Sequence, residues 1–170
     1  MRRAMAWSVA AGALVLSVAG AQPQSAGTAL VVQVRPEAHL NPAQVLLHFR
    51  VSADGASDLT SQTATIAAWV RAVPSQQIRI TARLESLSGS QGPAPPSALQ
   101  WTSSAVRGTA GGETARCTSG SFAGGAAQEL VEGWGRSGTL ACSVSFSLAE
   151  PRSLPAGEYS AVVSLSVGTM

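Results

Sequence analysis

The sequence predicts an all-β protein, an antiparallel β-sandwich of about seven or eight strands. Apolar and polar residues alternate with a period of two through most of the chain, which is typical of strands with one buried face. Clusters of Pro, Gly, Asn and Asp separate these alternating segments, as turns between short strands do. No segment carries apolar residues at the spacing of an amphipathic helix.

Each expected strand has one apolar face, and the strands follow one another with short interruptions. The long ones are expected over residues 30–35, 45–51, 63–72, 76–85, 139–148 and 159–167, and shorter ones over 99–101 and 129–134. In the segment 139–148, Leu140, Cys142 and Val144 share the inward face, opposite Thr139 and Ser143. Residues 36–42 are interpreted as a turn, and 86–97 and 104–128 as loops rich in Pro or Gly, the second with a short strand around Cys117 as an alternative.

The N-terminus has the three parts of a secretory signal peptide. Arg2 and Arg3 precede an uncharged apolar stretch over residues 4–18, and Ala19-Gly20-Ala21 form a small-residue cleavage site. We therefore expect residues 1–21 to be a signal peptide, 22–28 a mobile N-terminal segment and 29–170 a single domain.

The signal peptide indicates export to the periplasm, the cell surface or the extracellular space. The apolar stretch is shorter than the roughly 20 residues that span a bilayer, and no second long stretch follows. We expect no membrane span after cleavage, although an uncleaved anchor helix is an alternative. Cys117 and Cys142 are the only cysteines, and in an exported chain they are expected to form a disulfide.

Composition argues against several classes of function. The chain has 11 basic residues, all arginines, and 9 acidic ones, so removing Arg2 and Arg3 balances the charges. This leaves no basic surface for nucleic acid, and a chain without lysine has no Walker A motif. His39 and His48 are the only histidines and lack metal-ligand spacing, and no G-x-S-x-G motif is present. We expect no catalytic residue, metal or cofactor; a carboxylate pair at Glu129 and Glu132 is a weak alternative.

The C-terminal segment resembles the last hairpin of bacterial immunoglobulin-like domains. The resemblance lies in a strand over 144–148, the turn Leu154-Pro155-Ala156-Gly157 and a final strand that begins near Tyr159. It is similar to the ending of exported fimbrial and spore-coat-type subunits. The resemblance implies an immunoglobulin-like sandwich and a donor strand over 28–35 that completes a neighbouring subunit. Alternatively, that segment pairs within its own sheet.

Three tryptophans of the expected domain differ in their surroundings. Trp101 and Trp134 share faces with leucines, which predicts core packing. Trp69 lies instead on the polar face of its strand beside Arg71, where it could bind a sugar or a partner's side chain, or lie beneath a loop.

The sequence supports two hypotheses about function. The first is a non-enzymatic cell-envelope protein with a structural or surface-assembly role, whose partners are copies of itself or other envelope proteins paired through strands. The second is a carbohydrate- or protein-binding module that uses Trp69, Arg71 and the loops 86–97 and 104–128.

Overall fold

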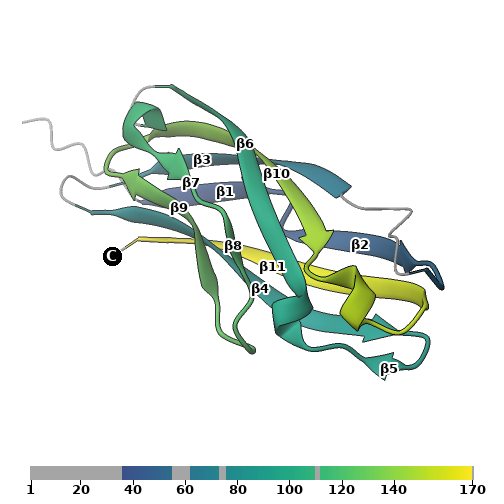
Figure 1. The fold of residues 1–170 in the computed structure, drawn as a ribbon. Helices are drawn as coiled ribbons and strands as arrows, with labels where there is room; N and C mark the ends of the chain where they lie inside the picture. The colour runs from purple at the N-terminus through teal and green to yellow at the C-terminus, as the bar shows by residue number, and fades with distance from the viewer. Residues whose placement is uncertain (1–35, 55–61, 73–75, 110–111, 170) are drawn as a thin grey trace, which may run out of the picture. The chain divides into compact units, whose positions relative to one another are not determined.

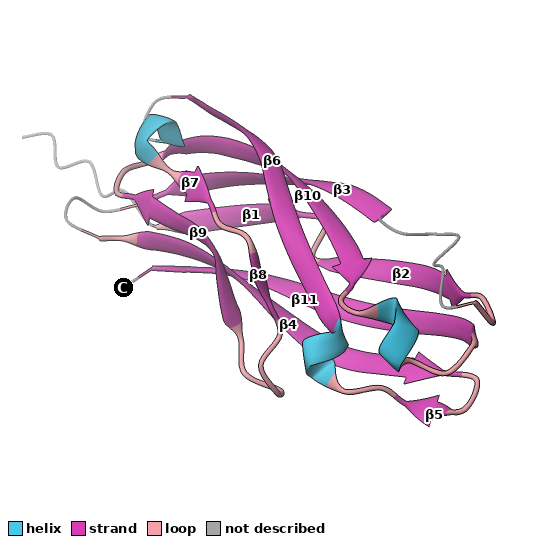
Figure 2. Ribbon diagram, viewed as in Figure 1, coloured by secondary structure: helices cyan, strands magenta, loops and turns pink. Residues whose placement is uncertain are grey.

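The computed structural model describes residues 36–54, 62–72, 76–109 and 112–169, which form an antiparallel β-sandwich (Figures 1 and 2). These residues belong to one compact unit, 33–170. Two sheets pack face to face, and every pair of neighbouring strands is antiparallel. The predicted all-β sandwich is therefore confirmed. The expected signal peptide, the segment 22–28 and the strand over 30–35 lie outside the described residues.

Each sheet draws its strands from distant parts of the chain. Sheet A has the order β1 (Glu37–Asn41), β3 (Gln62–Arg71), β10 (Gly138–Leu148), β6 (Leu99–Thr109) and β8 (Gly120–Ser121). Sheet B has the order β2 (Gln44–Val51), β11 (Gly157–Thr169), β4 (Ile78–Gly89), β9 (Gln128–Trp134) and β7 (Arg116–Cys117), with β5 (Gly92–Pro93) beside β4. The single-turn 3-10 helices η1 (Pro96–Ala98), η2 (Gly112–Thr114) and η3 (Pro151–Ser153) lie in the connections.

The core forms where the apolar faces of the two sheets meet. Alternation produces it directly: in β2 the burial pattern is strictly exposed then buried, and in β10 every second residue from Gly138 to Leu148 is buried. Trp101 and Trp134 are 3% and 1% exposed, which confirms that they pack in the core. Removing this apolar surface from water is the main favourable term in folding.

The disulfide crosses the sandwich. Cys117 on β7 of sheet B bonds to Cys142 on β10 of sheet A, with the two Cα atoms 6.2 Å apart. The expected pairing is confirmed. The bond ties the segment after β6 to the centre of the opposite sheet.

Three expectations about irregular segments were wrong. His39 lies in strand β1 and not in a turn, since the prolines at 36 and 42 stand just outside an edge strand, where their missing N–H groups cost little. Strand β6 continues to Thr109 and β8 also interrupts the expected loop 104–128, whereas β7 is the short strand around Cys117 expected as the alternative. Strand β4 likewise runs on to Gly89. In each case pairing with a neighbouring strand outweighs a weak local pattern.

The C-terminal turn is held by the residue that the family resemblance singled out. The Tyr159 hydroxyl donates a hydrogen bond to the Pro155 carbonyl at 2.7 Å. The ring packs on Gly89 of the neighbouring strand β4, at a place where a Cβ atom would overlap it. Tyr159 therefore fixes the turn before β11 against sheet B.

Candidate functional site

The outer face of sheet A carries a half-buried tryptophan on β3, near the end of that strand. Residues 66, 68 and 70 of β3 are buried in the core, so Trp69 projects from the opposite side of the sheet. In the register of the sheet, Trp69 pairs with His39 on β1 and with Thr139 on β10. Thr139 in turn pairs with Thr109 on β6, to which it is hydrogen-bonded through the side chain. Trp69 thus belongs to a row of side chains that crosses four strands.

The neighbouring row of side chains on this face is short in its middle, which leaves a depression beside Trp69. The row consists of Asn41, Ala67, Ala141 and Arg107, which are neighbours across the same four strands. Two methyl groups in the middle and longer side chains at both ends produce a hollow of about 580 Å³. We call it the Trp69 hollow; it is lined by His39, Leu40, Asn41, Ala67, Ala68, Trp69, Arg107, Thr109, Thr139, Leu140 and Ala141.

Side chains on β1 and β3 hold the indole of Trp69. The His39 ring lies with its centroid 5.5 Å from that of Trp69, at an interplanar angle of 35°. The guanidinium carbon of Arg71 lies 5.6 Å from the Trp69 ring centroid, within the range of a cation–π interaction. His39 itself donates from Nε2 to a Glu37 carboxylate oxygen at 2.9 Å. These contacts restrict the motion of the indole, which lowers the entropy that ligand binding would cost.

The structure brings together some of the predicted binding residues and separates others. Trp69 and Arg71 are in contact, and the segment 104–128 contributes Arg107 and Thr109 to the hollow. The segment 86–97 does not reach it; residues 91–95 instead border a separate depression beside Tyr159. Sequence reasoning missed His39, Asn41 and Arg107. Alternation over 37–41 was the available signal for the first two, but the flanking prolines concealed it.

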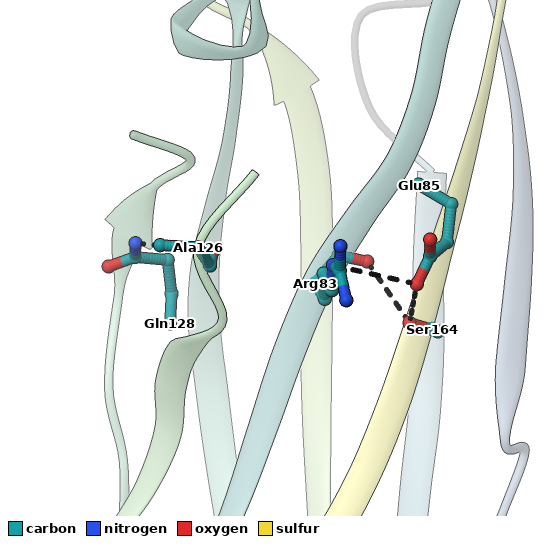
Figure 3. A network of polar contacts seen from close by, with 5 residues as sticks. All are labelled: Arg83, Glu85, Ala126, Gln128 and Ser164. Carbon is teal, nitrogen blue, oxygen red and sulfur yellow. Dashed lines mark hydrogen bonds and ion pairs between the residues drawn. The ribbon is translucent and has the colours of Figure 1, made fainter. Parts of the chain in front are cut away.

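The outer face of sheet B differs in how its charges are arranged. Arg79 on β4 forms an ion pair with Glu129 on β9 at 3.4 Å. Arg83 lies 3.9 Å from Glu85, whose carboxylate also accepts a 2.6 Å hydrogen bond from Ser164 on β11 (Figure 3). Both arginines of β4 therefore have carboxylate partners within the sheet.

The described residues do not bring together the side chains of a catalytic triad or a metal site. His39 lies in sheet A and His48 in sheet B, and no described hydroxyl or thiol is hydrogen-bonded to either imidazole. Within the described ranges, no group of three or more His, Cys, Asp or Glu side chains is placed to hold a metal ion. What the hollow presents is an aromatic ring, an amide, hydroxyls and a guanidinium.

Comparison of the chain with protein-family models, with curated proteins and with solved structures finds no match. In the described part of the chain, no helix is long and apolar enough to cross a membrane.

Proposed function

We propose that the protein is an exported, non-enzymatic β-sandwich of the cell envelope that binds carbohydrate in the Trp69 hollow. The observation that carries the proposal is the half-buried Trp69 beside a floor of two alanines, with hydrogen-bonding side chains around it. A pyranose ring has an apolar C–H face and a rim of hydroxyls. An aromatic ring suits the first, and Asn41, Thr109 and Thr139 suit the second.

Export rests on two features that support each other. The first 21 residues have the order of charge, apolar stretch and small residues that signal peptides share. The Cys117–Cys142 disulfide requires an oxidising compartment to persist. The periplasm, the cell surface and the extracellular space all meet this requirement.

A structural or surface-assembly role, as in fimbrial and spore-coat-type subunits, is the second candidate. It is favoured by Leu46, which is 65% exposed on β2, a strand that pairs among the described strands only with β11. Gln62, however, hydrogen-bonds through its side chain to both the N–H and the carbonyl of His48 on this edge. An added strand would have to displace that amide, and so we place carbohydrate binding first.

Trp69→Ala tests the proposal against a matched control, Leu46→Ala on the outer face of sheet B. Binding to an immobilised panel of bacterial and plant glycans, followed by titration of the best ligand, is the measurement. We expect Trp69→Ala to weaken binding by about 10-fold or more while Leu46→Ala leaves it unchanged, because only Trp69 contributes a stacking surface. Equal affinities in the two variants, or no glycan bound by the native protein, would contradict the proposal.

Light scattering on the same proteins tests the second candidate. A concentration-dependent rise in mass that Leu46→Ala abolishes would support assembly through β2. A monomeric mass in both proteins would contradict it.

A further inference from the structure

We propose that the Trp69 hollow selects acidic saccharides, whose carboxylate or sulfate groups bind Arg107, with Arg71 adding positive charge beside the tryptophan. This inference rests on the carbohydrate-binding function proposed above and specifies the class of sugar. It is carried by the charges that the outer face of sheet A leaves without a partner.

Arg107 lies opposite Ala141 in the register of sheet A and has no carboxylate there, whereas Arg71 lies directly opposite Glu37 on β1. Within the described residues, no carboxylate forms an ion pair with Arg71 or Arg107, whereas both arginines on β4 have one. The carboxylate on the described strands of this face, Glu37, accepts a hydrogen bond from His39. A single negative charge therefore stands against two arginines, although the mature chain as a whole is balanced. Of these three charged residues only Arg107 lines the Trp69 hollow, while Glu37 and Arg71 border a separate depression, so the unopposed positive charge at the hollow is that of Arg107.

Arg107 stands where an acidic substituent would project. It ends the row that begins at Asn41, and at the ordinary strand spacing the Cα atoms of these two residues lie about 14 Å apart. Arg107 lies two strands away from Trp69 and is displaced by two residues along the strand direction. This places the Cα atoms of Trp69 and Arg107 about 12 Å apart. A sugar ring lying over Ala67 and Ala141, with Trp69 beside it, would fill most of the distance between Trp69 and Arg107. The long arginine side chain spans the rest.

The chemistry of arginine suits this role. Its planar guanidinium binds a carboxylate or sulfate with two parallel hydrogen bonds, so that it reads orientation as well as charge. Such charge-assisted bonds are stronger than those between neutral groups. A neutral sugar would leave Arg107 solvated and would gain only the tryptophan and hydroxyl contacts.

Calorimetric titration of the exported form of the full chain provides the test, with probes that differ only in charge. The carboxylate probes are oligogalacturonates and oligomannuronates, each compared with its methyl ester, which retains the sugar but removes the charge. Dextran sulfate compared with dextran tests whether sulfate replaces carboxylate. The variants are Arg107→Gln, Trp69→Ala and, as a control on the outer face of sheet B, Arg83→Gln.

We expect at least one acidic probe to bind about 10-fold or more tightly than its neutral counterpart, as one charge-assisted bond would produce. Arg107→Gln should bring the ratio close to one by weakening binding of the acidic probe, with the neutral probe and the Arg83→Gln protein unaffected. Trp69→Ala should weaken binding of both probes.

Two results would overturn the inference and can be told apart from failure of the proposed function. If acidic and neutral probes bind equally, and Trp69→Ala weakens both, carbohydrate binding stands and the acidic preference is wrong. If an acidic probe is preferred but Arg107→Gln keeps the ratio, the preference does not arise at this residue. Binding of no probe at all would refute the inference and the proposed function together.

Discussion

The two outer faces of the sandwich are built from the same kind of strand but differ in their side chains: β4 on sheet B carries paired arginines, whereas sheet A carries a half-buried tryptophan beside a hollow. On sheet B, Arg79 pairs with Glu129 and Arg83 with Glu85, so both arginines of β4 have carboxylate partners, while Arg50 on β2 forms no ion pair among the described residues. On sheet A, Arg71 stacks on Trp69 and Arg107 borders the hollow, with no carboxylate partner in the described residues. Surface arginines that have found partners are typical of a solvated face. Under the proposed function, Arg107 beside the half-buried Trp69 is the part of this surface that meets the ligand.

The contrast between the two faces makes it possible to test stability and ligand binding separately. Exposed ion pairs contribute little to stability, so the outer face of sheet B is tolerant of change. The Trp69 hollow lies over the same core but adds little to it, because its floor and rim point away from the buried side. Stability and binding should therefore respond to different substitutions.

The largest expected effect comes from the disulfide that joins the two sheets. Replacing Cys117 and Cys142 together by serine should lower the free energy of unfolding by about 3 kcal/mol, the value for a loop of this length in the chain-entropy model. Urea unfolding followed by tryptophan fluorescence gives the change. Glycan affinity, measured well below the unfolding transition, should stay near native. A loss of affinity under those conditions would show that the hollow depends on the covalent link.

Filling the floor of the hollow should remove binding without a comparable loss of stability. Ala67→Leu places a branched side chain beside Trp69. We expect glycan affinity to fall about 10-fold or more, because the leucine occupies the space that the sugar ring would fill. The control is Ser166→Leu, which enlarges a small exposed side chain on the outer face of sheet B. Titration of both proteins, together with their unfolding midpoints, is the measurement. An equal loss of glycan affinity in both variants would contradict the view that only the outer face of sheet A binds.

Tyr159→Phe should affect stability alone. It removes the hydrogen bond to the Pro155 carbonyl, which lies in the turn before β11, and should cost about 1 kcal/mol. The thermal unfolding midpoint reports the loss, and the glycan affinity of the folded protein should be native. A midpoint equal to the native one would mean that water replaces the phenol without penalty.

The smallest effect is expected on the outer face of sheet B. Arg79→Gln breaks an ion pair whose side chains are 41% and 36% exposed, and should lower the free energy of unfolding by less than about 1 kcal/mol. Glycan affinity should not change. A change in glycan affinity in this variant would mean that the outer face of sheet B takes part in binding.

Sequence alone predicted the parts of the fold that depend on local alternation. In β2, β4, β10 and β11 the apolar residues recur at every second position, and those strands and their inward faces are confirmed. The disulfide was predicted because the chain has two cysteines and its first residues have the pattern expected of a signal peptide. Strand β1 and most of β6 were missed, because prolines flank the one and small polar residues fill the other.

The hollow could not be predicted from the sequence, because it depends on how β1, β3, β10 and β6 align with one another in sheet A. Trp69 and Arg71 are two residues apart and were singled out together, but Arg107 and Ala141 join them only through the pairing of β3, β10 and β6. Nothing local to any one of these strands specifies which residues will be neighbours across the sheet. Pairing across strands distant in sequence is a property of the folded chain, and a shift of one residue would turn every one of these side chains to the other face.

The two alanines under the hollow also have an evolutionary consequence. Ala67 and Ala141 point away from the core, so strand-compatible replacements there meet few packing constraints. One or two substitutions would deepen, divide or close the recess while the buried residues beneath stay the same. Under the proposed function, ligand preference would therefore change between related chains more readily than the sandwich that supports it.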